Sequence, residues 1–265
     1  MNTTGSQEDT ANGLSRRGSN ASQSQVRSDT DLFYEAMANL HHHEDNPSGA
    51  LPMNVAENKL GWTELKAKIE AISASQPLPD WVAGYTGAKG NPEVLAVLAE
   101  FMSTHLAQRE LIYSRNPAFN RAADNLNVAH MASNLTQWTI QQVLADHAFV
   151  DAFISNNRKR LTESYIEVVE ALRRSGIPYV PSRGSLFVWA DFSEFLEDQT
   201  EAADHQLWLR IYDATGILLT PGAGFGHTKH GMYRIVYPSL PRTSVHAALS
   251  RLEALVMGWR EVETA

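Results

Sequence analysis

Arg234 lies at the centre of an apolar stretch near the C-terminus, residues 231–238 (GMYRIVYP). The stretch has the composition of a strand, and a guanidinium buried there loses hydration that apolar neighbours do not restore. Arg234 therefore needs an anion, which is either an acidic side chain of this protein or a ligand. Its planar set of donors suits a carboxylate held by two parallel hydrogen bonds, so the ligand we expect is a small carboxylic acid.

Three other patterns could belong to a ligand-binding or metal site, but each is weaker evidence of a site than Arg234. The glycine-rich residues 221–226 (PGAGFG) would let the backbone approach a ligand closely, although a plain turn has the same composition. His227 and His230 follow this turn without a third metal ligand beside them. The adjacent histidines at 41–43 do not converge as residues at helical spacing do, so we expect a solvated linker there and no metal site.

The overall composition is that of a globular protein, since 265 residues with 43% hydrophobic content can bury one good core or two modest ones. The net charge of -8 opposes binding to nucleic acid or to an anionic membrane, because both require clustered positive charge. No apolar run approaches the roughly 18 residues of a membrane span, and the N-terminus lacks the apolar core of a secretory signal. We expect a cytoplasmic protein that contacts neither nucleic acid nor membrane.

The elements that must position Arg234 fall into four predicted segments. Residues 1–45 are polar, and we expect a disordered tail and linker. Residues 46–110 form an N-terminal arm and helices, one of which begins at Asn91 with a polar cap and a proline in its first turn. Residues 111–178 hold a short strand at 111–113 and helices, the longest of which Asp146 can cap and Gly176 can end.

The fourth segment, residues 179–265, alternates strands with helices and predicts a small α/β domain. Short apolar runs bounded by Gly and Pro predict strands at 186–190, 217–220 and 233–237. Apolar residues at helical spacing predict one helix around Trp208 and a final helix after Pro241. Arg234 thus lies on the last strand of this domain.

Several segments together resemble the fold-type I pyridoxal-phosphate enzymes, in particular the aminotransferase class I/II branch that contains 1-aminocyclopropane-1-carboxylate synthase and its fungal relatives. Residues 46–60, with the sequence Ala56-Glu57-Asn58, look like the substrate-side loop of that branch. Residues 85–102 (YTGAKGNPEVLAVLAEFM) are similar to its Y-x-G-x-x-G-x-P stretch. The other matching segments occur in the expected order at 113–116, 157–161, 184–191, 220–225 and 231–238.

This resemblance implies an α/β protein with a truncated transferase fold, in which helices and a small C-terminal domain remain and the major sheet is largely missing. Arg234 would grip the α-carboxylate of an amino-acid substrate, with Ala56 and Glu57 beside the substrate. Tyr85 would bind the phosphate of pyridoxal 5'-phosphate in a neighbouring subunit, which implies a homodimer or a pair with a paralogue. The implied reaction is transamination, or an elimination such as carbon–sulfur cleavage, in fungal secondary metabolism.

The sequence departs from that family between Met102 and Leu111, where the family has most of its large domain and this chain has residues 103–110 (STHLAQRE). No lysine of the chain lies in the Ser-x-Ser-Lys motif that anchors the cofactor and moves protons. We therefore expect no catalytic residue, no covalently attached cofactor and an impaired activity. Two alternatives stay open: a non-catalytic remnant that binds a partner or an intact paralogue, and a decayed gene model.

Overall fold

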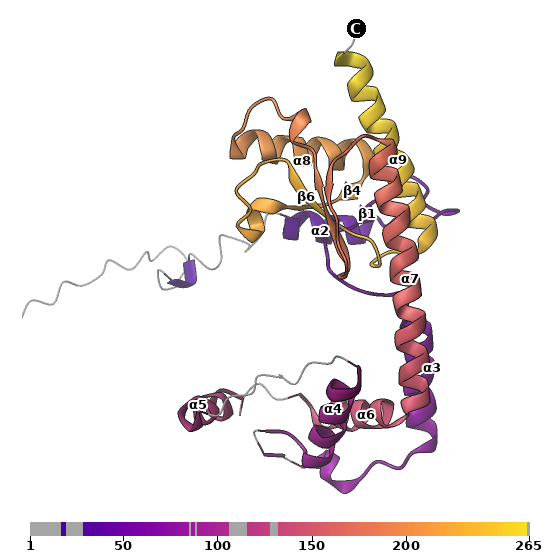
Figure 1. Ribbon diagram of the computed structural model, residues 1–265, viewed down its shortest axis with the longest axis vertical. Helices are drawn as coiled ribbons and strands as arrows, with labels where there is room; N and C mark the ends of the chain where they lie inside the picture. The colour runs from indigo at the N-terminus through magenta and orange to yellow at the C-terminus, as the bar shows by residue number, and fades with distance from the viewer. Residues whose placement is uncertain are drawn as a thin grey trace, which may run out of the picture. The chain divides into compact units, whose positions relative to one another are not determined.

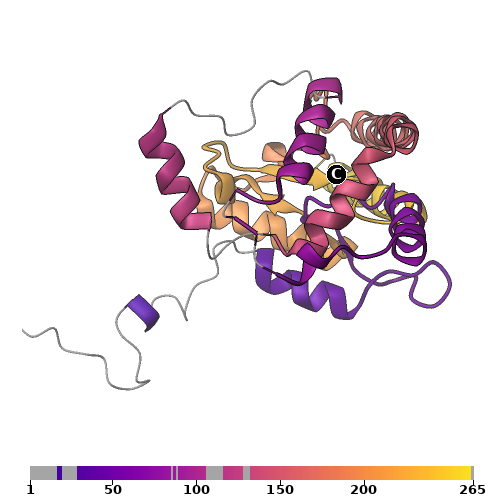
Figure 2. The ribbon, with the colours of Figure 1, turned by 90° about the horizontal axis from the view of Figure 1, so that it is seen from below.

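A computed structural model describes residues 17–19, 29–84, 86–87, 89–105, 116–127 and 132–263. Its contacts divide the chain into two compact units, drawn in Figure 1 and from below in Figure 2. The sheet unit comprises Met1–Leu60 and Arg160–Ala265, and the helical unit comprises Gly61–Lys159. The long helix α7 (His147–Arg174) contributes its first part to the helical unit and its second part to the sheet unit. The predicted α/β class is confirmed, whereas the division into four segments stays a prediction.

The sheet unit is built around a four-stranded antiparallel sheet and a parallel two-stranded one. In spatial order the larger sheet contains β2 (Tyr179–Val180), β3 (Phe187–Asp191), β6 (Met232–Val236) and β5 (Thr220–Pro221). The smaller sheet pairs β1 (Leu51–Pro52) with β4 (Ile217–Leu218). The strands predicted at 186–190 and 233–237 are confirmed within one residue.

The strand predicted at 217–220 is divided between two sheets. Residues Ile217 and Leu218 pair with β1, whereas Thr220 pairs with β6. The carbonyl oxygen of Leu219, which lies between them, accepts a hydrogen bond from the indole Nε1 of Trp208 at 3.0 Å. The apolar run 217–220 therefore does not form one strand. Its two ends pair with different strands, and the carbonyl of Leu219 between them bonds to the side chain of Trp208.

Four helices enclose the apolar core of the sheet unit. They are α2 (Asp29–Ala38), the second part of α7, α8 (Glu201–Thr215) and α9 (Arg242–Glu263). The helix α8 packs against α9 and β4, and α2 lies against β1 and β4 (Figure 1). The buried α8 residues Leu207, Trp208 and Ile211 recur at helical spacing, so one face of the helix enters the core. The two predicted helices of the C-terminal domain are confirmed.

Helix α2 lies inside the segment for which the sequence predicts a disordered tail and linker. Ala36 is fully buried, and Leu32 and Phe33 pack against the core. With Met37 and Leu40 they recur at helical spacing, a periodicity that the prediction of a disordered segment did not take into account. Packing against β1 and β4 buries part of this face.

The helical unit contains α3 (Trp62–Ser75), α4 (Pro92–His105), α5 (Pro117–Asn127), α6 (Asn134–Ala145) and the first part of α7. Two predicted caps are confirmed. The side-chain oxygen of Asn91 accepts from the amide of Glu93 at 2.8 Å, and Asp146 Oδ1 accepts from the amide of Phe149 at 3.0 Å. Sequence analysis did not anticipate α6 as a separate helix, and the strand predicted at 111–113 lies outside the described residues.

The end of α7 follows the prediction. Gly176 has φ of +65°, a left-handed conformation that residues with a Cβ rarely adopt, and the amide of Ile177 bonds to the carbonyl of Leu172 at 2.8 Å. Across the described ranges, no helix combines the length and the apolarity needed to cross a membrane.

Candidate carboxylate-binding site

Arg234 occupies the middle of β6 and is only 5% exposed. It pairs across the sheet with Trp189 of β3 and with Thr220 of β5. Directly paired residues project from the same face of a sheet, so these three side chains share one face. Arg234 Nη2 donates to the carbonyl oxygen of Asn54 at 2.6 Å and lies 3.4 Å from the Thr220 hydroxyl oxygen. One end of the guanidinium is thus fixed by neutral oxygens.

Aromatic rings cover the guanidinium of Arg234. Its Cζ lies 4.6 Å from the ring centroid of Phe225 and 5.0 Å from that of Phe187. Trp189 meets both rings edge to face, at centroid distances of 5.9 Å and 6.5 Å. Cation–π contacts of this kind are worth about 0.5 to 2 kcal/mol each, depending on their exposure to water. The rings therefore contribute to stabilising the positive charge and restrict the orientation of the guanidinium.

The strand β3 supplies two of these rings because its residues alternate between faces. Val188 and Ala190 are buried in the core, whereas Phe187, Trp189 and Asp191 are partly exposed. The larger sheet therefore has a core face and an aromatic face, and Arg234 lies on the aromatic face. Sequence analysis missed Phe187 and Trp189 as site residues, although the alternation in FVWAD placed them on one face.

Phe225 reaches Arg234 from the turn η3 (Gly222–Phe225). A Cβ on Gly222 would lie 2.8 Å from the carbonyl oxygen of Met232 in β6, which is closer than real Cβ atoms approach. Gly226 then ends the turn with φ of +72°. The glycines predicted as a plain turn or a ligand loop thus bring the turn close to β6 and place the ring of Phe225 on the guanidinium.

The N-terminal arm also meets β6, as its resemblance to a substrate-side loop suggested. The amide of Val236 bonds to the carbonyl of Met53 at 2.9 Å, and Thr220 Oγ1 donates to the carbonyl oxygen of Asn54 at 2.9 Å. Ala56 and Glu57 follow on this arm and are exposed. Their predicted contact with substrate stays a prediction, and Tyr85 lies outside the described residues.

Glu57 and Asp191 each pair with a lysine. Glu57 Oε2 lies 2.7 Å from the Lys59 amine, and Asp191 pairs with Lys229. Burial is the largest influence on Asp191 and opposes its ionisation, but hydrogen bonds from Lys229 and Ser193 together outweigh it and lower the pKa of its carboxyl. Asp191 is therefore a carboxylate at neutral pH and is matched by a cation.

The segment after η3 is anchored by the buried Asp204 of α8. Asp204 Oδ1 accepts from the amide of Gly231 at 2.8 Å, and its backbone oxygen accepts from the Tyr233 hydroxyl at 2.7 Å. Burial, with the charge of Asp204, raises the pKa of Tyr233, so this hydroxyl stays protonated and donating. His230 approaches the same carboxylate at 3.8 Å. In the described ranges, no cluster of three His, Cys, Asp or Glu side chains is arranged to hold a metal ion.

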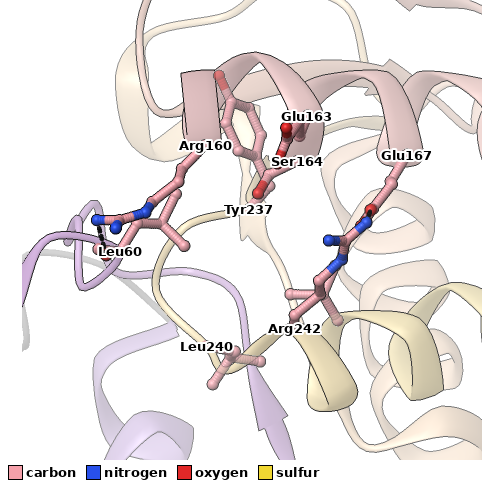
Figure 3. Close-up of a pocket in the computed structure, with 9 residues that line it drawn as sticks. Leu60, Arg160, Glu163, Ser164, Glu167, Tyr237, Leu240 and Arg242 are labelled. Carbon is pink, nitrogen blue, oxygen red and sulfur yellow. Dashed lines mark hydrogen bonds and ion pairs between the residues drawn. The ribbon is translucent and has the colours of Figure 1, made fainter. Parts of the chain in front are cut away.

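A cavity of about 190 Å³ lies along the sheet-unit part of α7 (Figure 3). Arg160 and Arg242 stand at its two ends, with Glu163 and Ser164 between them. Arg160 Nη1 donates to the carbonyl of Leu60 at 3.0 Å, and Arg242 pairs with Glu167. No site residue predicted from the sequence lines this cavity. Both of its arginines, like Arg234, bond to oxygens of the protein.

Comparison with known proteins supports a family assignment. The model of the family "Aminotransferase class I and II" matches residues 111–252, which include the whole of β6. The chain is 32% identical over 146 residues to the 1-aminocyclopropane-1-carboxylate synthase CMW33 of Cucurbita maxima, covering 55% of this chain and 30% of that protein. It is 32% identical over 154 residues to the 1-aminocyclopropane-1-carboxylate synthase 4 of Oryza sativa subsp. japonica, covering 56% and 31%.

The chain spans less than a third of the length of these curated relatives. Solved structures that it resembles include an aminotransferase from Mycobacterium tuberculosis, with a TM-score of 0.45 and 22% identity over 54% of this chain and 36% of that one. An aromatic aminotransferase from Pyrococcus horikoshii OT3 gives a TM-score of 0.46 and 15% identity over 53% and 36%. Because the family model covers more than half of its residues, the chain belongs to the aminotransferase class I and II family.

Proposed function

We propose that this chain binds the α-carboxylate of an amino acid at Arg234, in a pyridoxal-phosphate-dependent protein of the aminotransferase and 1-aminocyclopropane-1-carboxylate synthase kind. The observation that carries the proposal is a guanidinium that is 5% exposed and lies between neutral oxygens and aromatic rings. In such surroundings an incoming carboxylate interacts strongly, because little water screens the charges. Ala56 and Glu57 would lie beside the substrate.

The lysines of the sheet unit do not fit a covalently bound pyridoxal phosphate. An anchoring lysine must present a neutral amine to the aldehyde. Lys59 lies 2.7 Å from Glu57, and Lys229 pairs with Asp191. Each of these amines is thus engaged by a carboxylate of the protein. We therefore derive no chemical step for this chain alone, and propose that transamination or elimination is impaired in it.

A second candidate role is that of a subunit that pairs with an intact paralogue or with another copy of itself. The helical unit exposes several large apolar side chains, and exposed apolar surface of this kind is typical of interfaces. They are Trp62 at 55%, Leu78 at 58%, Leu95 at 42% and Leu135 at 51%. A cytoplasmic location and a place in fungal secondary metabolism stay predictions.

The carboxylate proposal is tested by titrating the ¹⁵N-labelled chain with L-leucine and with L-leucinamide, which lacks the carboxylate. With L-leucine we expect changes in the ¹⁵N chemical shifts of residues around β6. L-leucinamide should bind at least tenfold more weakly. Arg234→Lys should weaken L-leucine binding by a similar factor, because an ammonium cannot hold a carboxylate through two parallel hydrogen bonds. The control is Arg242→Lys at the exposed pair with Glu167. Equal binding of acid and amide, or no effect of Arg234→Lys, would refute the proposal.

Cofactor attachment is tested by adding pyridoxal phosphate, reducing with borohydride and mapping labelled peptides. We expect no stoichiometric label at any lysine, and one fully labelled site would contradict this expectation.

The pairing role is tested by sedimentation of the chain alone and with a full-length relative. A chain that stays monomeric under both conditions would rule out the pairing role.

A further inference from the structure

Phe225 is the ring nearest to the Arg234 guanidinium, and half of it is open to solvent. Its centroid lies 4.6 Å from Arg234 Cζ, and the residue is 48% exposed. Aromatic rings offer a large apolar contact area. Because Phe225 lies against the guanidinium, its exposed part adjoins the point at which a carboxylate would bind.

The rings constrain how a ligand can approach Arg234. The donors of a guanidinium lie in its plane, and Cζ of Arg234 lies over the rings of Phe225 and Phe187. A carboxylate that accepts two hydrogen bonds from this group lies in that plane, and the atoms attached to the carboxylate then lie close to aromatic surface. Apolar atoms gain by contact with that surface, and charged atoms lose hydration there.

Polar groups near these rings bond within the protein. Asp191, two residues along β3 from Trp189, pairs with Lys229. Thr220 is fully buried, and its hydroxyl donates to the Asn54 carbonyl. The His227 ring lies 6.0 Å from that of Trp189, and its Nδ1 accepts from the amide of Lys229 at 3.1 Å. Phe187, Trp189 and Phe225 thus form the apolar part of this face, with His227 beside Trp189.

We propose that Phe225 is a specificity-determining residue, which contacts the side chain of the bound amino acid and selects apolar side chains. This inference rests on the proposed function, because it requires a carboxylate on Arg234. The ligand class is then an α-amino acid with an aliphatic, thioether or aromatic side chain.

The test compares L-leucine with glycine, which share the carboxylate and the amine but differ in the side chain. Each buried methylene is worth about a fourfold gain in affinity. We expect the unmodified chain to prefer L-leucine by about tenfold or more, as measured by ¹⁵N chemical-shift titration. In Phe225→Ala this preference should fall to within about twofold. Phe225→Tyr, which keeps the ring, should restore it.

Phe119→Ala is the matched control, because Phe119 is 46% exposed but belongs to α5 of the helical unit. It should leave the preference for L-leucine unchanged. If L-leucine binding depends on Arg234 but the preference survives in Phe225→Ala, the inference is wrong and the proposed function stands. If no binding depends on Arg234, both are wrong.

Discussion

The sheet unit and the helical unit are stabilised in different ways. The sheet unit has one large cluster of buried apolar side chains, contributed by its strands and by α2, α7, α8 and α9. In the described part of the helical unit, the buried apolar residues are Ile72, Val94, Trp138 and Val150. A dense core resists local rearrangement. The sheet unit can therefore hold a costly buried guanidinium in one orientation.

In the helical unit, hydrogen bonds from side chains to backbone join segments that share few buried apolar contacts. Asn134 Nδ2 donates to the carbonyl of Trp81 at 3.1 Å. Gln137 Oε1 accepts from the amide of Asn91 at 2.9 Å, and Gln137 Nε2 donates to the carbonyl of Ala132 at 3.0 Å. Two side chains at the start of α6 thus fix the loop before α4. The two units thus differ in how many apolar side chains each buries.

The largest expected effect comes from matched isoleucines in the two units. Ile211 is fully buried in the sheet unit, and Ile72 is 5% exposed in the helical unit. We expect Ile211→Ala to cost about 4 kcal/mol, because the dense core cannot close the cavity, and Ile72→Ala to cost about 2 kcal/mol. Hydrogen exchange followed by peptide mass spectrometry reports each unit separately. Equal costs would contradict the contrast between the two units.

A smaller effect is expected at the polar contacts of the helical unit. Gln137→Leu removes the acceptor for the buried amide of Asn91 and should cost about 1 to 2 kcal/mol. Faster hydrogen exchange should appear in α4 and α6 and leave β3 and β6 unchanged. The control is Gln141→Leu, because Gln141 Nε2 donates to an exposed side chain, the Glu93 carboxylate, at 3.2 Å. If Gln137→Leu has no larger effect than the control, the polar contacts are not what holds this unit.

The smallest expected effect concerns the stability of the sheet unit at high pH. Tyr237 is 3% exposed, and its hydroxyl donates to the carbonyl of Ser185 at 2.8 Å. Burial and then the nearby Tyr165 raise the pKa of Tyr237 to about 12, above its ordinary value of 10.0. The neutral hydroxyl is favoured in the folded protein, so its contribution is complete below pH 10 and is lost as the pH rises to about 12.

Tyr237→Phe should therefore cost about 1 kcal/mol at pH 8 and reduce the loss of stability between pH 10 and 12. Urea unfolding at a series of pH values measures both quantities. Tyr34→Phe is the control, because Tyr34 is 68% exposed. An identical pH profile for Tyr237→Phe and the unmodified chain would show that the Tyr237 hydroxyl is not held neutral by the fold.

Local chemistry in the sequence predicted much of this structure. The caps Asn91 and Asp146, the glycine that ends α7 and the positions of β3 and β6 depend on neighbouring residues, so the sequence showed them. The contact between Arg234 and Asn54 joins residues far apart in the chain, and no local pattern encodes it. Helix α2 was missed although its apolar residues recur at helical spacing, because the prediction rested on the polar composition of residues 1–45 as a whole.

The candidate site was likewise predictable in part. The need of Arg234 for an anion follows from one charged residue in an apolar strand. The covering rings follow only from the register of β3 on β6 and from the turn that carries Phe225, which are properties of the folded sheet. The role of Tyr85 stays a prediction.

The most direct test of the central claim is the stability of Arg234→Met with and without L-leucine. If Arg234 receives a ligand, the substitution alone should cost about 1 to 2 kcal/mol, from its bonds to Asn54 and Thr220. L-leucine at ten times its Kd should stabilise the unmodified chain by about 1.4 kcal/mol and leave Arg234→Met unchanged. A loss of about 3 to 5 kcal/mol without ligand, together with no stabilisation by L-leucine, would instead identify a buried structural ion pair.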